Sequence, residues 1–281
     1  MNESQEMAVR RNLQAAAKAR PVGLTATVGQ WTIHLVWGLI QMTGIAVAVI
    51  RQSLRPLTWR RTVRAELLEQ CLQVGLRALP FIVVTGSLVG IGLVYQAIYW
   101  LGFIGHTEFT GPLLAIVLVR EVAPLFVALI VIGRSGSVII VELGNMRIDG
   151  QIRMLDAQGI DPFLFLIVTR VVAVSVCMFS LTVVFIAVAL GSGFLTGNAL
   201  GSMNLTLQQF IIGILTEMDF AEIAMVPLKT FSIGFVVALI VCTTGLSVTV
   251  SRTELLATLP RGITKSVLAA LLISGLLTLL L

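Results

Sequence analysis

The fold prediction starts from residues 117–162, VLVREVAPLFVALIVIGRSGSVIIVELGNMRIDGQIRMLDAQGIDP, because two unlike segments meet there. The first half is apolar enough to lie in a bilayer, yet it contains Arg120 and Glu121. The second half is amphipathic and ends at Asp161-Pro162, where the residue before proline disfavours helical geometry. A charged residue at the centre of a membrane helix costs about 2.5–3.5 kcal/mol on insertion scales. The stretch therefore predicts a membrane span whose two charged residues have a partner or a function. A surface helix is predicted to follow it.

The composition of the whole chain agrees with a membrane protein. Of its 281 residues, 57% are hydrophobic and 12% are charged, and the mean hydropathy is +0.99. Soluble domains carry about 25% charged residues. Several apolar runs reach the length of about 20 residues that a helix needs to cross a bilayer. We therefore expect an all-α polytopic membrane protein. The net charge of +5 does not indicate nucleic-acid binding, because the basic residues flank the apolar runs.

Five membrane spans are predicted, with a cytoplasmic N-terminus, because Lys and Arg concentrate in alternate connections. Residues 1–71 are expected to form a cytoplasmic N-terminal segment. It contains an interfacial helix over 24–50 that is basic at both ends, with a true span as the alternative. Residues 72–281 form the membrane domain. Its predicted spans are 72–101, 112–133, 163–190, 226–250 and 266–281, with a cytoplasmic loop and helix over 134–161 and a periplasmic segment over 191–225.

Three local features refine these spans. Pro124 cannot donate a backbone hydrogen bond, so it should free the carbonyl of Arg120 and kink the helix. Arg170 lies close enough to a predicted cytoplasmic helix end for its side chain to extend to the interface. Gly86, Gly90 and Gly92 place small residues along one side of the first span, a spacing that lets two helices approach closely.

The pair Arg120-Glu121 has two interpretations. Neighbouring residues of a helix point about 100° apart, so the two side chains do not readily pair with each other. Each needs another helix, water in a cavity, or a ligand. One interpretation is an interhelical ion pair that fixes the packing. The other is that Arg120 binds an anionic head group, because a guanidinium group can bind phosphate through two parallel hydrogen bonds.

The segment from Glu142 to Gln158 reads as an amphipathic helix. Asp149 and Arg153 have the i, i+4 spacing of a supporting pair. Gly150 should weaken this helix by about 1 kcal/mol relative to alanine. The segment is either an ordinary connector on the membrane surface or a docking helix for a cytoplasmic motor subunit.

Motifs of catalysis and cofactor binding are absent from the sequence. There is no GxxxxGK[ST] motif for nucleotide, and no HExxH or GxSxG motif. The three cysteines, Cys71, Cys177 and Cys242, show no CxxC spacing, so neither a metal site nor a disulfide is supported. We expect no cofactor, no metal and no enzymatic activity in this chain.

Four motifs occur in an order and spacing that resemble a known family. They are LVREVAP (118–124), GRSGS (133–137), VELGNMRIDGQIRML (141–155) and GIDP (159–162). Together they resemble the MlaE/YrbE family of ABC-transporter permeases. Val122-Ala123 and Ile148-Asp149-Gly150 depart from the family pattern, which suggests a divergent branch.

The resemblance implies a homodimeric permease in the inner membrane of Gram-negative cells that moves phospholipid between the inner and outer membranes. The implied partners are a cytoplasmic ABC ATPase, a periplasmic MCE-domain lipid-binding protein and a small cytoplasmic STAS-type subunit. The lipid-binding residues assigned on this basis are Arg120, Glu121, Leu88, Ile91 and Tyr95. The residues assigned to ATPase coupling are Glu142, Met146, Arg147, Asp149, Gln151, Arg153 and Asp156.

Two functions of other classes remain alternatives. A secondary transporter driven by an ion gradient would place Arg120 and Glu121 in an ion path, although no obvious inverted repeats are present. A scaffold of an envelope complex without a transport cavity would tolerate leucine at both positions.

Overall fold

The computed structural model describes residues 24–55, 61–104, 115–199, 212, 220–248 and 251–279. Over these ranges the chain is helical apart from short turns, and they contain no strand, which confirms the all-α prediction. The chain divides into two compact units, Met1–Val47 and Ala48–Leu281. The first unit holds most of helix α2 (Leu24–Ser53), and all the later helices belong to the second. Whether α2 lies in the interface or crosses the membrane stays a prediction.

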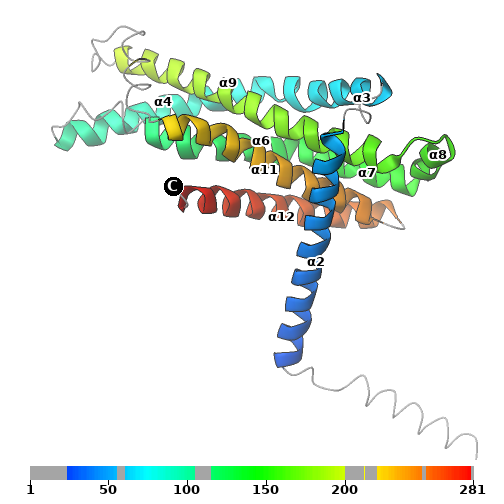
Figure 1. Cartoon of the computed structure of the whole chain (residues 1–281). Helices are drawn as coiled ribbons and strands as arrows, with labels where there is room; N and C mark the ends of the chain where they lie inside the picture. The colour runs from blue at the N-terminus through cyan, green and yellow to red at the C-terminus, as the bar shows by residue number, and fades with distance from the viewer. Residues whose placement is uncertain are drawn as a thin grey trace, which may run out of the picture. The chain divides into compact units, whose positions relative to one another are not determined.

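Five helices of the second unit are long and apolar enough to cross a membrane, which confirms the predicted number of spans (Figure 1). Their bounds are Arg61–Trp100, Val117–Ile148, Phe163–Ala199, Ala224–Ser247 and Arg252–Leu279. The elements in chain order are α3 (Arg61–Cys71), a π-helical segment (Leu72–Leu76), α4 (Leu79–Ile104), a π-helical segment (Ala115–Val122), α6 (Ala123–Val131), a π-helical segment (Ile132–Gly136), α7 (Ser137–Ile148), α8 (Gln151–Ala157), a π-helical segment (Phe163–Val168), α9 (Thr169–Ala199), α11 (Phe220–Ser247) and α12 (Arg252–Leu279).

The second span is longer than predicted. The sequence prediction ended it at residue 133 and placed a loop after it, but the helix continues through GRSGS as the π-helical segment Ile132–Gly136 and then as α7. The loop prediction is therefore wrong. It rested on Arg134, which together with Arg147 and Arg153 indicated a cytoplasmic segment. A helix inside a membrane bundle tolerates arginine and glycine because neighbouring helices cover its backbone.

Helices α9 and α11 form the centre of the bundle, and α4 and α12 lie at its edges. In the most apolar 18-residue stretch of α11, 61% of the residues are buried, whereas 22% are buried in the corresponding stretch of α12. Close approach of α4 to α9 depends on Gly90, because a Cβ there would overlap the carbonyl oxygen of Ala189. The predicted glycine contact is thus confirmed at Gly90 but is wrong for Gly92, where a Cβ would meet no atom within 4 Å.

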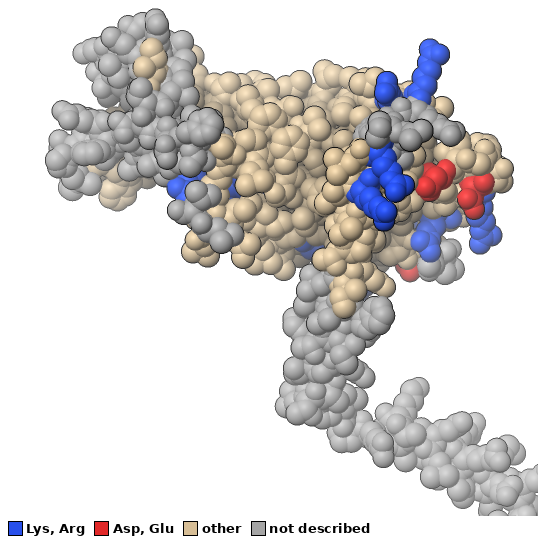
Figure 2. Space-filling model, viewed as in Figure 1, with Lys and Arg blue, Asp and Glu red and all other residues tan. Residues whose placement is uncertain are grey.

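The amphipathic segment Glu142–Gln158 is two helices. Gly150 has a φ of +73°, a left-handed conformation that glycine adopts without steric cost, and it separates α7 from α8. The expectation of one continuous helix is wrong. The left-handed conformation of Gly150 interrupts the helix between α7 and α8, whereas the sequence pattern predicted only that the glycine weakens it. Figure 2 shows acidic and basic side chains gathered at the end of the bundle that carries α8, while the tan flank beside them is largely uncharged.

Candidate functional site

Glu121 joins three helices near the end of the bundle far from α8. Its Oε2 atom accepts a hydrogen bond from Nζ of Lys229 on α11 at 2.9 Å. Its Oε1 atom accepts a hydrogen bond from the Thr278 hydroxyl on α12 at 2.8 Å. Lys229 is only 1% exposed, so its charge is compensated by Glu121 and not by water. We call Glu121, Lys229 and Thr278 the Glu121 cluster.

The ammonium group of Lys229 uses all three of its donors. In addition to Glu121, it donates to the hydroxyl oxygen of Thr278 at 3.0 Å and to the backbone carbonyl of Arg120 at 3.0 Å. The Arg120 carbonyl is the group that Pro124 was predicted to free. A lysine from another helix supplies the donor that the proline lacks, as expected for a polar backbone group inside a membrane protein.

Lys229 is a site residue that sequence reasoning missed. A usable signal was present, because Lys229 is the sole Lys or Arg between Arg170 and Arg252. An isolated lysine within an apolar helix requires a counter-charge, and Glu121 was an acidic residue without an assigned partner.

Arg120 lies at the border of the Glu121 cluster. Its Nε atom is 3.8 Å from Oε1 of Glu121, and its side chain is 25% exposed. The neighbouring pair therefore makes only a long contact, while the close ion pair of Glu121 is with Lys229, as the helical geometry predicted for two adjacent residues. Arg120 therefore lies beside the cluster with a partly exposed side chain.

The other three residues predicted to bind lipid lie elsewhere on the chain. Leu88, Ile91 and Tyr95 are on the exposed face of α4, with exposures of 65%, 42% and 55%. The opposite face of α4, which includes Gly90 and buried Val94, packs against α9. The hydrogen bonds of Glu121 lead to α11 and α12 instead. The structure therefore does not bring the three α4 residues together with the cluster, and their role stays a prediction.

A second ion pair connects α7 to α9 near α8. Arg170, 1% exposed, donates from Nη2 to Oε1 of Glu142 at 2.9 Å and from Nη1 to the carbonyl of Leu166 at 3.1 Å. The expectation that Arg170 extends to the interface is wrong, because the carboxylate of Glu142 provides a nearer partner inside the protein. Arg147 on α7 also donates to the backbone carbonyl of Leu246 on α11.

The remaining residues predicted for ATPase coupling lie around the break between α7 and α8. Met146 is half-buried. Asp149 is exposed, and its Oδ1 lies 3.8 Å from Nη2 of Arg252 on α12, where the sequence had suggested a pair with Arg153. The exposed members on α8 are Gln151, Arg153 and Asp156. The arrangement leaves α8 as an exposed charged element whose two flanking helices are tied to the bundle, and a coupling role stays a prediction.

Metal ligands do not cluster in the part of the chain that the structure describes. All three cysteines are free thiols.

Comparison with known proteins places the chain in a family. The model of the family described as Permease MlaE matches residues 67–280. A probable ABC transporter permease protein of Synechocystis is 29% identical over 189 residues, which cover 67% of this chain and 71% of the relative. The chloroplastic protein TRIGALACTOSYLDIACYLGLYCEROL 1 of Arabidopsis thaliana is 27% identical, over 76% of this chain and 59% of the relative. The intermembrane phospholipid transport system permease protein MlaE of Haemophilus influenzae is 32% identical, over 47% of this chain and 50% of the relative. With most of its length matched, this polytopic membrane protein belongs to the MlaE permease family.

Proposed function

We propose that the chain is the permease subunit of an ABC transporter that moves phospholipid between the inner and outer membranes of a Gram-negative cell. The observation that carries the proposal is Arg120, a partly exposed arginine held beside a closed ion-pair cluster inside a membrane bundle. A relative named as an intermembrane phospholipid transport permease supports lipid as the substrate. The chain itself has no enzymatic role in this proposal.

Arg120 provides the head-group contact. A guanidinium group forms two parallel hydrogen bonds with a phosphate, and such charge-assisted bonds are among the stronger ones in proteins. The Glu121 cluster supports this role because Lys229 satisfies one oxygen of Glu121 and Thr278 the other. The cluster thus holds Glu121 in place, and the partly exposed guanidinium group of Arg120 beside it is the cation that we assign to the phosphate.

The acyl chains of the lipid are assigned to α4. Leu88, Ile91 and Tyr95 form an exposed apolar face on an edge helix of the bundle. In the proposed homodimer, two such faces and two Arg120 side chains frame one lipid-sized cavity. Large exposed apolar surfaces of this kind mark lipid or protein contacts.

A separate ABC ATPase acts on the residues around α8. Asp149, Gln151, Arg153 and Asp156 are exposed there. The bonds Glu142–Arg170 and Arg147–Leu246 connect α7 to α9 and to α11. A force on α8 would therefore move several spans together. A periplasmic MCE-domain protein would exchange lipid at the other end, a small STAS-type subunit would bind the ATPase, and the N-terminus would be cytoplasmic.

The test is charge reversal at Arg120 in the assembled transporter. We expect Arg120→Glu to abolish ATP-dependent phospholipid transfer between vesicles, while the ATPase still co-purifies with the permease. The matched control is Arg261→Glu, which reverses an exposed charge on α12. Full transfer by Arg120→Glu would overturn the assignment.

The second arm of the experiment addresses the alternative classes. A secondary transporter would be active as a purified single protein and would depend on an ion gradient. A scaffold would retain its cellular phenotype when Arg120 and Glu121 are both replaced by leucine. Transport that requires the ATPase and ATP, and that is lost on charge reversal, excludes both.

A further inference from the structure

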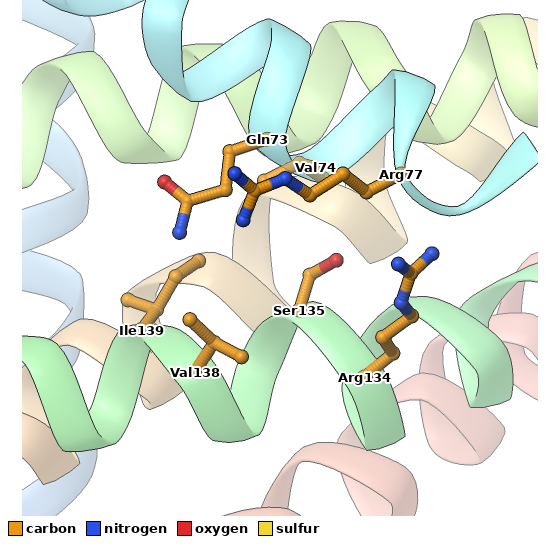
Figure 3. Close-up of a pocket in the computed structure, with 7 residues that line it drawn as sticks. All are labelled: Gln73, Val74, Arg77, Arg134, Ser135, Val138 and Ile139. Carbon is orange, nitrogen blue, oxygen red and sulfur yellow. The ribbon is translucent and has the colours of Figure 1, made fainter.

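A small pocket with two arginines among its lining residues lies between the first and second spans, away from the Glu121 cluster. Figure 3 shows the side chains that line it, contributed by two facing helices. One wall comes from the π-helical segment Leu72–Leu76 and the residues just after it, and the other from the π-helical segment Ile132–Gly136 and α7. Its volume is about 90 Å³. The lining residues are Gln73, Val74, Arg77, Arg134, Ser135, Val138 and Ile139.

The pocket carries two positive charges and no negative one among its lining residues. Arg77 is exposed and reaches along its own helix toward Gln73, while Arg134 approaches from the facing helix (Figure 3). The guanidinium carbon of Arg134 lies 5.0 Å from the centre of the Phe81 ring. Its Nη1 atom is buried and has no hydrogen-bond partner in the part of the chain that the structure describes. A buried donor without an acceptor is costly, so the pocket favours an anion.

The pocket is separate from the Arg120 site. Arg134 and Arg120 are 14 residues apart on one helical span, which corresponds to about 21 Å along the axis at 1.5 Å per residue. One head group cannot contact both. The two arginines thus lie toward opposite halves of the bundle, with Arg134 on the side nearer to α8.

An exposed apolar strip leads away from the pocket along α4. Phe81, Val84 and Leu88 follow Arg77 at intervals of four, seven and eleven residues, so all four share one face of the helix. The three apolar side chains are 57%, 59% and 65% exposed. A cationic pocket at one end of an apolar strip is complementary to a phospholipid. The phosphate would lie in the pocket and an acyl chain along the strip. The pocket itself is far below the roughly 300 Å³ at which small-molecule sites begin.

We propose that Gln73, Arg77, Arg134 and Ser135 bind the phosphate of a membrane phospholipid whose acyl chain lies along Phe81 and Val84. This is a second lipid site in each subunit, in the half of the bundle opposite to Arg120. It does not require the transport function, because it concerns binding by the permease alone. In the transporter proposed above, it would hold a lipid in the leaflet nearer to α8.

The experiment measures binding to the purified full chain in detergent, in an Arg120→Gln background that removes the first site. The probes are dihexanoyl phosphatidic acid, inorganic phosphate and dihexanoyl glycerol, titrated by calorimetry. We expect phosphatidic acid to bind more tightly than either other probe. Arg77→Leu should weaken its binding at least tenfold, because Arg77 is exposed and can be replaced without opening the core. Arg261→Leu, which removes an exposed arginine outside the pocket, should leave the affinity unchanged.

Two further variants separate the sources of the phosphate. Val84→Asn should weaken binding of phosphatidic acid and leave that of inorganic phosphate unchanged, because only the lipid reaches the strip. Gln73→Leu repeats the test within the pocket without a change of charge. Unchanged binding of phosphatidic acid in Arg77→Leu overturns the proposal. Equal affinity for inorganic phosphate and phosphatidic acid overturns its lipid part. Either result leaves the transport proposal standing, since that proposal depends on Arg120.

Discussion

The two ion pairs of the bundle differ in how completely their atoms are satisfied. In the Glu121 cluster, Lys229 uses its three donors and both carboxylate oxygens of Glu121 accept hydrogen bonds. In the second pair, Nε of Arg170 and Oε2 of Glu142 are buried without a hydrogen-bond partner among the described residues. Both pairs contain one fully buried cation, so burial alone does not distinguish them.

This difference separates a fixed junction from a rearrangeable one. A buried charge whose bonds are all made holds its helices in one geometry, because any movement leaves a polar group unsatisfied. A pair with unused bonding capacity can exchange one acceptor for another at lower cost. The rearrangeable pair lies in α7 and α9, the two helices that flank α8. This position suits an element that transmits movement, whereas the closed cluster suits one that must hold Arg120 still.

The largest expected effect comes from Lys229→Met. The substitution keeps the volume of the side chain but leaves Glu121 without its cation. We expect the free energy of unfolding to fall by about 3–5 kcal/mol, the usual result of removing one partner of a buried pair. SDS-induced unfolding in mixed micelles measures it. Glu121→Gln in the same chain should recover a large part of the loss. If the double variant is no more stable than the single one, the cluster is not held together by charge.

Arg170→Met should cost less, although Arg170 is buried as deeply as Lys229. The side chains of Glu142 and Glu121 are about equally exposed, at 36% and 35%, so the expected difference comes from the bonds that are lost. Arg170 donates two hydrogen bonds, whereas Lys229 donates three. We expect a loss of about 1.5–3 kcal/mol in the free energy of unfolding, the range for a hydrogen bond to a charged group. The same mixed-micelle assay applies. A loss equal to that of Lys229→Met would contradict the distinction between the two pairs.

Thr278→Val isolates the hydrogen bonds of the Glu121 cluster from its charges. Valine has nearly the shape of threonine but removes one donor to Glu121 and one acceptor for Lys229. We expect a loss of about 1 kcal/mol in the free energy of unfolding. Thr264→Val on the same helix is the control, because the Thr264 hydroxyl is exposed and bonds only its own helix at the carbonyl of Pro260. Equal losses for the two variants would show that the closure of the cluster carries no extra stability.

The outline of the fold could be predicted from the sequence because it depends on length and polarity. Apolar runs of bilayer length gave five spans, and Pro124 correctly pointed to a backbone carbonyl in need of a donor. The continuous helix through GRSGS and the break at Gly150 were not predicted. The continuous helix depends on neighbouring helices that cover the backbone, and a local pattern does not contain that information. The break at Gly150 is a local helix end, for which the glycine itself was the available signal.

The candidate site could be predicted only in part, for a similar reason. Arg120 and Glu121 stood out because charges are rare in apolar runs. The partners of the charged groups come from distant segments: Lys229 lies 108 residues after Glu121, and Arg170 lies 28 residues after Glu142. Pairing at such separations is set by which helices pack together. The sequence identifies groups that need partners but does not say which partners they have.

The smallest effect is expected from Arg252→Ala, which tests whether proximity alone gives an ion pair its strength. Arg252 lies 3.8 Å from Asp149, but its side chain is 77% exposed and that of Asp149 is 42% exposed. Exposed pairs contribute little, because water solvates both charges and salt screens them. We expect a change within about 0.5 kcal/mol in the free energy of unfolding, measured in the same mixed micelles with and without added salt. A loss as large as that of Arg170→Met would mean that the connection between α7 and α12 is as strong as the buried pairs. The contrast between the two ends of the bundle would then rest on something other than desolvation.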